Sequence, residues 1–424
     1  MTDISEPLID AARLDALMGE FAAHGGTADG GMHRLALSAE DGAARDALGA
    51  WMRAQGLSVT VDAMGNMFGL LDWAGPGAPV VMTGSHLDSQ PRGGRFDGAY
   101  GVVAGCEALL AVRARAAAEG VAPRCNLAVV NWTNEEGARF QPSLLGSAVF
   151  AGLMDGADAR GRRDGDGVSV AEALDAIGYA GDGVFAAPQA YVEMHVECGS
   201  VLERAGGRLG AITRHWGAVK YRLAFLGAQT HTGPTPMAER HDALLGAAHL
   251  VVALGAMPGR SEGGVLHASV GRLEVRPNSP NVVPGEAVLF IELRSPEQAV
   301  LDWAEREMLV LAEAACAAAR VRHEVRFVDR RAMGFFAEGL VALAAGAAGE
   351  LGVGMGRLDT VAAHDAISMI ALCPSVVLVV PSVGGVCHDP TEFTRDEDLA
   401  LGTEVLARVL WRLCRDGIDA AGVA

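Results

Sequence analysis

The sequence is short of basic residues and contains no closely paired cysteines. Its 424 residues include 34 Lys and Arg against 52 Asp and Glu, a formal net charge of −18 at pH 7. Nucleic-acid phosphates are bound by clustered basic side chains, so we expect no nucleic-acid partner and attribute the acidic surface to solubility. The seven cysteines are scattered, and none belongs to a Cys-x-x-Cys pair. This pattern excludes a thiolate zinc finger and favours reduced thiols in a cytoplasmic protein.

Leader-like segments and long apolar runs are also missing. The first residues, MTDISEPLIDAARL, are acidic and contain no apolar core, so we expect no secretory signal. Residues 366–386 form the most apolar stretch, but Pro374 and Pro381 interrupt it, so we expect no membrane span. The pattern G-x-x-x-x-G-K-[ST] is absent, which argues against a nucleotide-binding protein built on the loop at Gly93-Gly94.

Hydrophobic residues and glycine are abundant, and their pattern predicts an α/β fold. Hydrophobic residues make up 50% of the chain and 55 residues are glycine, enough for a large interior with many tight turns. At this length we expect two domains. Strand patterns alternate with helical patterns before residue 213 and after residue 330, which indicates a mixed sheet flanked by helices. The segment between them has the β-α-β-β-α-β order of a ferredoxin-like α+β domain. The prediction is a catalytic domain over residues 1–212 and 331–424, interrupted by a lid domain over residues 213–330.

The individual elements follow from apolar periodicity and from Gly and Pro punctuation. Helices are predicted over residues 8–21, 38–55, 98–118, 170–177, 242–254, 296–320, 339–351 and 396–415. Strands are predicted over residues 57–61, 67–71, 79–83, 127–132, 190–194, 219–225, 264–273, 287–293, 324–328 and 376–380.

Side chains that can bind metal follow four of the predicted strands. They are His86 after PVVMT, Glu135-Glu136 after NLAVVNW, His195 after AYVEM and His388 after VVLVVPSVGGV. Any one of them alone would more often be a surface or core residue. Because active sites of open α/β sheets lie outside the carboxyl ends of the strands, four such placements indicate one shared site. Imidazole and carboxylate groups suit Zn²⁺, Mn²⁺ or Co²⁺, and the number of ligands suits a dinuclear centre that includes Asp97.

Several longer motifs run in a fixed order from about residue 84 to residue 393. They are GSHLDSQPRGGRFDGAYGV, NEEGARF, LLGS, VEMHVECGSVLE, GAQTHTGPTPMAERHDAL, NSPNVVPGE, AAHDAISM and CHDPTEF. With these motifs the chain resembles the M20 metallopeptidase-type amidohydrolases, and within them the hydantoinase/carbamoylase branch. That branch includes N-carbamoyl-L-amino acid hydrolases, β-ureidopropionases and allantoate amidohydrolases.

The resemblance implies two divalent metal ions per subunit, zinc or else manganese, cobalt or nickel. It assigns His86, Asp97 and His195 to one ion, and Asp97, Glu136 and His388 to the other. Asp97 would then bridge the two ions, and Asp88 would orient His86. Glu135 would be the general base that takes a proton from water and returns it to the leaving nitrogen.

The resemblance also assigns residues to the substrate. His231 matches a histidine that polarises the scissile carbonyl, often across a dimer interface, so a homodimer through residues 213–330 is implied. Asn281 and Arg294 match residues that hold a substrate carboxylate, which a planar guanidinium suits. Cys198 stands where the branch usually has Gln, and residues 360–363 before His364 read Thr-Val-Ala-Ala instead of Ser-Gly-Ala-Gly. These two departures are expected to affect substrate choice and not metal binding.

The predicted activity is hydrolysis of the N-carbamoyl C–N bond of a small carboxylate substrate, such as an N-carbamoyl amino acid. Allantoate hydrolysis and hydrolysis of an N-acyl amino acid or dipeptide remain alternatives on the same machinery. A non-catalytic binding paralogue is disfavoured because the base and all five expected ligands are present. No membrane partner is expected.

Overall fold

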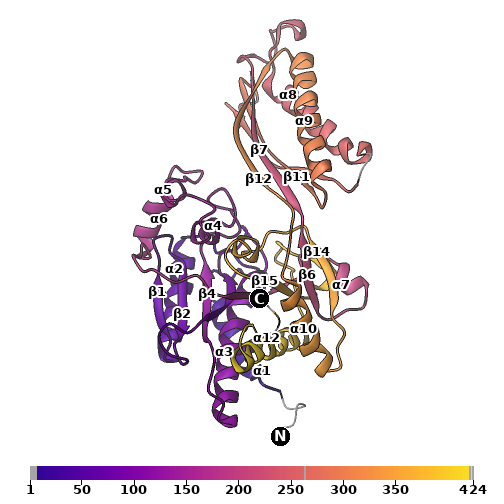
Figure 1. The fold of residues 1–424 in the computed structure, drawn as a ribbon. Helices are drawn as coiled ribbons and strands as arrows, with labels where there is room; N and C mark the ends of the chain where they lie inside the picture. The colour runs from indigo at the N-terminus through magenta and orange to yellow at the C-terminus, as the bar shows by residue number, and fades with distance from the viewer. Residues whose placement is uncertain (1–6, 262–263, 420–421, 423–424) are drawn as a thin grey trace. The chain divides into compact units, whose positions relative to one another are not determined.

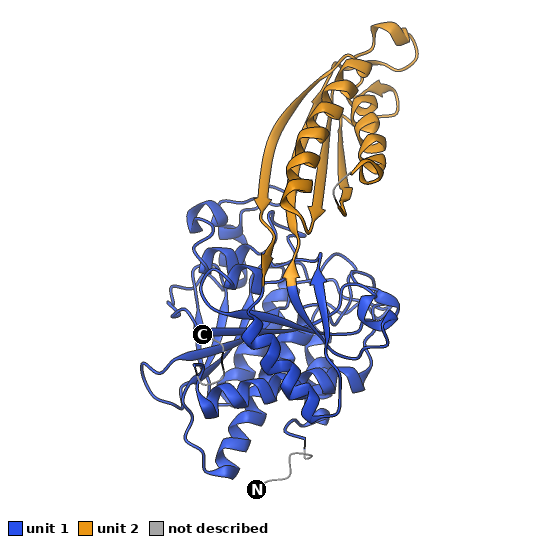
Figure 2. Cartoon of the chain, turned by 45° about the vertical axis from the view of Figure 1, so that its right-hand side comes forward, with its two compact units in different colours: residues 1–213, 336–424 blue, residues 214–335 orange. Residues whose placement is uncertain are grey.

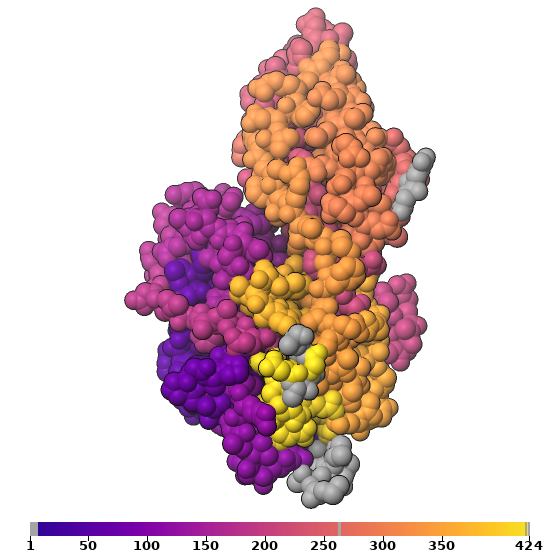
Figure 3. Space-filling model, viewed as in Figure 1, coloured from indigo at the N-terminus to yellow at the C-terminus, as the bar shows by residue number. Residues whose placement is uncertain are grey.

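The computed structural model describes residues 7–261, 264–419 and 422. The chain divides into two compact units, Met1–Thr213 with Phe336–Ala424 (unit 1) and Arg214–Phe335 (unit 2) (Figure 2). Figure 3 shows the two halves of unit 1 side by side, the indigo-to-magenta half against the orange-to-yellow half. Unit 2 is therefore an insertion, and it extends a few residues beyond the predicted 213–330.

Unit 1 contains a large mixed sheet flanked by helices, as predicted (Figure 1). The strand order is β1-β2-β4-β3-β5-β15-β6-β13, and β14 pairs with β6. The strands are β1 (Ser58–Val61), β2 (Met67–Leu71), β3 (Val80–His86), β4 (Asn126–Trp132), β5 (Ala190–Val196), β6 (Gly210–His215), β13 (Gly334–Phe335), β14 (Gly356–Thr360) and β15 (Ser375–Val380). Of these, β13 and the last two residues of β6 fall within the residue range of unit 2. The four neighbours β4, β3, β5 and β15 are mutually parallel. Their residues are almost all buried, which is typical of parallel strands covered on both faces.

The helices of unit 1 are α1 (Ala11–Ala22), α2 (Ala39–Ala54), α3 (Ala99–Glu119), α4 (Leu145–Phe150), α5 (Gly156–Arg160), α6 (Val170–Ile177), α7 (Val201–Arg204), α10 (Glu338–Glu350), α11 (Ala366–Met369) and α12 (Asp396–Asp416). Four of the helices described in unit 1, namely α1, α2, α5 and α6, start at a side-chain cap. Ser38 caps α2 by accepting from the Asp41 N–H, and Ser169 forms a capping box with Glu172. Asp10 caps α1, so this helix begins three residues later than predicted. Helices α3 and α12 pack together over the sheet and bury most of their apolar residues in the main core.

Unit 2 is a four-stranded antiparallel sheet of order β12-β7-β11-β9 with two helices. Its strands are β7 (Gly217–Leu226), β9 (His267–Arg276), β11 (Glu286–Ser295) and β12 (Arg322–Arg331), and its helices are α8 (Ala243–Ala256) and α9 (Gln298–Ala319). Both helices pack on the sheet and share one hydrophobic core with it. The chain order and the sheet order are those of the ferredoxin-like split β-α-β fold. A two-stranded ribbon, β8 (Thr230–His231) with β10 (Val282–Val283), stands apart from this sheet.

Two differences from the predicted elements affect the site. Strands β3 and β5 continue to His86 and Val196, so the two histidines lie inside strands and not in the loops after them. The polar residues in these strand ends break the apolar pattern, yet backbone pairing with parallel neighbours extends to His86↔Trp132 and Val379↔His195. Strands β6, β13 and β14 were not predicted, because short segments with few β-branched residues carry little periodicity.

Candidate active site

Four neighbouring parallel strands deliver the site residues to one edge of the sheet. His86 ends β3, His195 is the next-to-last residue of β5, and Glu135-Glu136 follow β4. His388 lies beyond β15, after a short 3₁₀ turn at Val383–Gly385. Because these strands are parallel and adjacent, their carboxyl ends meet, and the structure brings together all the residues predicted as metal ligands.

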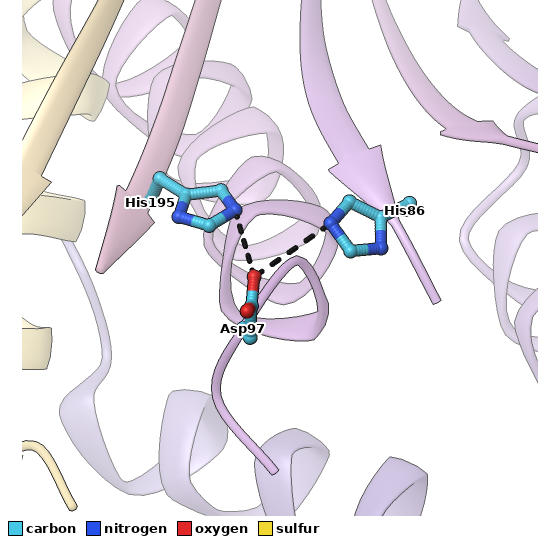
Figure 4. A group of neighbouring side chains, drawn as sticks. All are labelled: His86, Asp97 and His195. Carbon is cyan, nitrogen blue, oxygen red and sulfur yellow. Dashed lines mark ion pairs between the residues drawn. The ribbon is translucent and has the colours of Figure 1, made fainter. Parts of the chain in front are cut away.

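The carboxylate of Asp97 lies between His86 and His195 (Figure 4), and His388 contacts it as well. Its Oδ1 lies 3.8 Å from His86 Nε2 and 3.2 Å from His195 Nε2. Its Oδ2 faces the other way and lies 3.1 Å from His388 Nε2, which in turn is 3.3 Å from Glu136 Oε2. The two oxygens of one carboxylate are thus divided between two groups of ligand atoms, as a bridging ligand requires.

Backbone carbonyls fix the orientation of two of these imidazoles. His86 Nδ1 is 2.8 Å from the carbonyl oxygen of Asp88, and His195 Nδ1 is 2.8 Å from that of Val196. A carbonyl only accepts, so Nδ1 carries a hydrogen and Nε2 is left to face Asp97, where it can bind a cation once it has lost its own proton. Ligand histidines in metal sites are commonly held in this way.

The donor set fits divalent metal ions. Ligand atoms about 2.0–2.2 Å from one zinc ion lie roughly 3–4 Å apart. The imidazole–carboxylate separations, from 3.1 to 3.8 Å, fall in that range. His86, Asp97 and His195 are buried and close enough to share an ion. The potential ligand atoms of Asp97, Cys387 and His388 are also close enough to share one, with His388 exposed. The nitrogen and oxygen donors suit zinc, manganese, cobalt or nickel.

Asp97 and the neighbouring histidines shift one another's pKa values. Burial opposes ionisation of Asp97, but hydrogen bonds from His195 and His388 hold its pKa well below the ordinary value. Hydrogen bonds to Asp97 and Glu136 raise the pKa of His388 to about 12. A bound cation would replace the proton on His388, because both occupy the same space between imidazole and carboxylate.

Asp88 holds a different partner from the one predicted. Its carboxylate is 3.7 Å from His86 Nδ1, beyond hydrogen-bonding distance, and only its backbone carbonyl contacts that ring. The carboxylate instead accepts from the backbone N–H groups of Glu135 (3.2 Å) and Glu136 (3.3 Å). Asp88 therefore positions His86 through its main chain and the two glutamates through its side chain.

Glu135 has the surroundings of a proton acceptor. It is buried, and its Oε2 lies 3.5 Å from His86 Nε2. Burial, followed by the negative charge of Asp365 and then of Glu136, raises the pKa of Glu135 well above the ordinary value. Catalytic carboxylates are tuned in this direction, so that they can hold a proton during a reaction near neutral pH.

Two features of the loop between β3 and α3 were not predicted from the sequence. The Glu392 carboxylate accepts from the backbone N–H groups of Phe96 (2.9 Å) and Asp97 (3.1 Å), and so fixes the bridging residue. A Cβ at Gly94 would lie 2.0 Å from Glu392, and a Cβ at Gly98 would lie 2.3 Å from the His86 ring. Both glycines are required by close approach, and the motifs GGRFDG and CHDPTEF carried the signal.

His364 and Cys198 lie beside the histidine cluster. The rings of His364 and His195 are 4.6 Å apart and nearly perpendicular, and Glu193 lies close enough to form a third potential ligand group with them. Thr360 Oγ1 is 3.3 Å from His364 Nε2. Residues 360–363, which depart from the usual sequence of the branch, therefore contact this ring directly. Cys198 lies against Cys387, with the two sulfur atoms 2.9 Å apart.

The residues predicted in unit 2 do not come together within one chain. His231 and Asn281 are exposed and flank the β8–β10 ribbon, where Thr232 N–H donates to the Asn281 carbonyl. This ribbon adjoins the sheet end marked by the Leu226↔Glu286 pair. Arg294 is half-buried, pairs with Ala218 at the opposite end of the sheet, and forms an ion pair with Glu292 at 2.8 Å.

A sheet edge that gathers three imidazoles and several carboxylates is typical of metallohydrolases. Residues 82–412 match the family described as peptidase family M20/M25/M40, and the chain belongs to this family. N-carbamoyl-L-amino-acid amidohydrolase of Rhizobium meliloti is 36% identical over 401 residues, covering 94% of this chain and 95% of that protein. Allantoate amidohydrolase of Bacillus subtilis is 34% identical over 397 residues, covering 92% and 95%.

Solved structures agree with the sequence relatives. An amidase of the hydantoinase/carbamoylase family from Burkholderia vietnamiensis has a TM-score of 0.93 and is 35% identical, covering 98% of this chain and 100% of that one. The chain is thus an M20 amidohydrolase of the carbamoylase and allantoate amidohydrolase type, a hydrolase of non-peptide C–N bonds.

Proposed function

We propose that this protein is a dinuclear metal-dependent hydrolase that cleaves the N-carbamoyl C–N bond of a small carboxylate substrate. The observation that carries the proposal is the division of the Asp97 oxygens between His86 and His195 on one side and His388 on the other. The names of the relatives from Rhizobium meliloti and Bacillus subtilis favour a carbamoyl or ureido group as the target. Allantoate is the second candidate substrate.

The reaction divides among residues already described. When bound, the divalent ions supply Lewis acidity, which lowers the pKa of water and polarises the ureido carbonyl. Glu135 accepts a proton from the attacking water and then donates it to the leaving nitrogen. Asp88 holds the backbone on both sides of Glu135, so the base keeps its position during this transfer. The products are the amino acid, ammonia and carbon dioxide.

Arg294 is the proposed partner of the substrate carboxylate. Its guanidinium donates to the carboxylate of Glu292. Glu292 is two residues earlier in β11, so the two side chains lie on the same face of the sheet. Glu292 also lies 3.6 Å from Lys220, so this carboxylate neighbours two cations. A substrate carboxylate would be attracted to the same positive charges, and a planar guanidinium binds it bidentately.

The geometry of unit 2 supports the proposed homodimer. Arg294 lies eight positions after Glu286 along β11, which corresponds to about 27 Å of extended chain. A small substrate cannot span that distance between Arg294 and the ribbon that carries His231 and Asn281. We therefore assign Arg294 to the site of its own copy, and His231 with Asn281 to the site of a second copy.

Helix α8 offers an apolar surface for that second copy. The segment Ala243–Arg260 is apolar and long enough to cross a membrane by composition alone, yet only 33% of it is buried within the structure. Leu245, Ala248 and Val252 are exposed at helical spacing, on the side opposite the buried Leu250 and Leu254. A second copy would cover this stripe.

Mixing two impaired variants, assayed at a substrate concentration far below the KM of Arg294→Ala, tests the shared site. Under these conditions His231→Ala and Arg294→Ala each weaken every site of their own homodimers. After the copies exchange, half of the dimers are mixed and each has one intact site, so about a quarter of the wild-type activity returns. No recovery, with exchange verified by mass, would show that one copy supplies both residues.

The substrate class is tested by ammonia release and, for the N-acyl compounds, whose hydrolysis yields no ammonia, by release of the free amino acid. The panel contains N-carbamoyl-α-amino acids, N-carbamoyl-β-alanine, allantoate and N-acyl amino acids, each with the metal-loaded protein. Ammonia release from the carbamoyl compounds alone is expected, and turnover confined to N-acyl compounds would overturn the proposal. A Cys198→Gln variant, which restores the usual residue of the branch, is expected to shift preference among the carbamoyl substrates. The thiol content also supports a cytoplasmic location, which fractionation of cells would test.

A further inference from the structure

Two cysteines at the candidate metal centre are packed closer than unbonded atoms prefer. Cys198 Sγ and Cys387 Sγ are 2.9 Å apart, whereas unbonded heavy atoms such as carbon pack best at about 3.5–4.0 Å. Cys387 Sγ is also 3.0 Å from Asp97 Oδ2. A thiol has one hydrogen, so Cys387 can donate to only one of these neighbours at a time.

The pair connects two segments that are remote in sequence. Cys198 follows His195 by three residues, and Cys387 directly precedes His388. Both cysteines are half-buried, so small oxidants can reach them. Ser382 and Val386 close the loop before Cys387 through a hydrogen bond, so the loop that carries the thiol is itself ordered.

A second pair of cysteines in unit 1 provides an internal comparison. Cys125 and Cys414 also have their sulfur atoms 2.9 Å apart, but both residues are fully buried, one before β4 and the other near the end of α12. The two pairs have the same distance between their sulfur atoms, but only Cys198 and Cys387 are accessible to solvent. Because thiol oxidation follows exposure, we expect this pair to be oxidised more readily than Cys125 and Cys414. Of the cysteines in unit 1, Cys106 and Cys373 lack a close sulfur neighbour among the described contacts.

We propose that Cys198 and Cys387 form a reversible disulfide that switches the enzyme off under oxidising conditions. The thiolate of one cysteine attacks the O–O bond of a peroxide, which breaks as an S–O bond forms and water leaves. The sulfur of the second cysteine then displaces hydroxide from that sulfenic acid, forming the S–S bond, and a second water is released. Two thiols lose two electrons and two protons in total, and the peroxide is reduced to water.

The disulfide acts on the metal centre through two changes. Oxidation removes the thiol hydrogen that Cys387 donates to Asp97, the residue between the three histidines. It also draws the two sulfur atoms to about 2 Å, which moves the segment before His388 towards the end of β5. Displacements of this size in catalytic groups reduce turnover by about 100-fold. The inhibition rests on the proposed function, whereas formation of the disulfide does not.

The test uses the metal-loaded enzyme titrated with hydrogen peroxide. Remaining thiols are alkylated, and peptides are mapped without reduction. The expected result is a cross-link between the Cys198 and Cys387 peptides at peroxide concentrations that leave Cys125 and Cys414 alkylatable after unfolding. Ammonia release should fall in parallel, by roughly 100-fold, and dithiothreitol should restore both. In Cys387→Ser the cross-link and the dithiothreitol-reversible part of the loss should disappear, whereas Cys125→Ser should respond as the wild type does.

Three results would overturn the proposal. One is oxidation of both pairs at the same peroxide concentration, and another is a loss of activity without the cross-link. The third is a cross-link that forms only after chelation, which would make Cys387 a metal ligand. If the cross-link forms but no carbamoyl substrate is hydrolysed by the reduced enzyme, the proposed function fails and the disulfide stands.

Discussion

The two units place their functional residues in opposite ways. Unit 1 gathers its histidines and carboxylates at one sheet edge, and most of them are buried and oriented by backbone groups. Unit 2 places His231 and Asn281 in the open at one end of its sheet and Arg294 at the other. The residues proposed for metal binding and catalysis are therefore gathered within one unit of one chain, whereas the residues proposed for substrate recognition lie apart from one another.

Buried histidines show the same contrast. In unit 1, burial would lower the pKa of His195, but its hydrogen bond to Asp97 raises that pKa well above the ordinary value. In unit 2, burial and then the charge of Arg331 lower the pKa of His215 to about 4. A carboxylate neighbour prepares an imidazole to bind a cation, and a cationic neighbour excludes one.

Removal of metal should have the largest effect. A strong chelator followed by desalting is expected to reduce ammonia release to background, because without cations the three imidazoles only form ion pairs with Asp97. Readdition of zinc, manganese, cobalt or nickel should restore activity to different extents. Metal analysis should give two ions per chain, and activity that resists chelation would contradict the proposed mechanism.

The adjacent glutamates should separate catalysis from metal binding. Glu135→Gln is expected to lower kcat by roughly 100- to 10,000-fold, because a general base is lost, while the metal content remains at two ions. Glu136→Gln is the matched control, since Glu136 contacts His388 and its loss should lower the metal content as well. Equal metal loss in both variants would show that Glu135 is a ligand and not the base.

A smaller effect is expected for Arg294 in unit 2. Arg294→Ala should raise KM for a carboxylate substrate by about 10- to 100-fold, the loss of a charge-assisted hydrogen bond, with metal content unchanged. Arg294→Lys should recover part of this loss, since the charge remains and the planar fork does not. With the amide of the same substrate, wild type and variant should become equal. An undiminished difference on the amide would place Arg294 outside carboxylate recognition.

The sequence was sufficient to predict the sheet edge but not the contacts within it. Metal-capable residues followed four apolar segments, and parallel pairing of those segments brought them together as expected. The role of Asp88 was only partly predicted, because a sequence does not show whether a side chain or its own carbonyl faces a neighbouring ring. Glu392 was missed for a related reason, since 296 residues separate it from the Phe96 N–H that it binds.

In unit 2, the order of helices and strands could be predicted from the sequence. The distance between Arg294 and the pair His231 and Asn281 could not. Alternating strands and two helices gave the ferredoxin-like order, and the strand over 264–273 was displaced only to His267–Arg276. The resemblance grouped His231, Asn281 and Arg294 as one set of substrate residues. Sheet register separates them, because Arg294 pairs with Ala218 while the ribbon adjoins Leu226. This separation is visible only in the three-dimensional pairing, and it is the observation on which the proposal of a site shared by two copies rests.

The smallest predicted effect concerns stability and returns to His215. Its pKa of about 4 in the folded protein is below the ordinary value of 6.5, so the unfolded chain binds more protons between these values. The free energy of unfolding should therefore fall by about 1–3 kcal/mol as pH drops from 6.5 to 4 on account of this residue. His215→Gln should lack that part of the decrease when wild type and variant are unfolded in urea at both pH values.

His323→Gln is a control in the same unit, because His323 lies 2.9 Å from the carboxylate of Glu313. Parallel decreases in the wild type and His215→Gln would mean that His215 is protonated without cost, and the contrast between the two histidine environments would not hold.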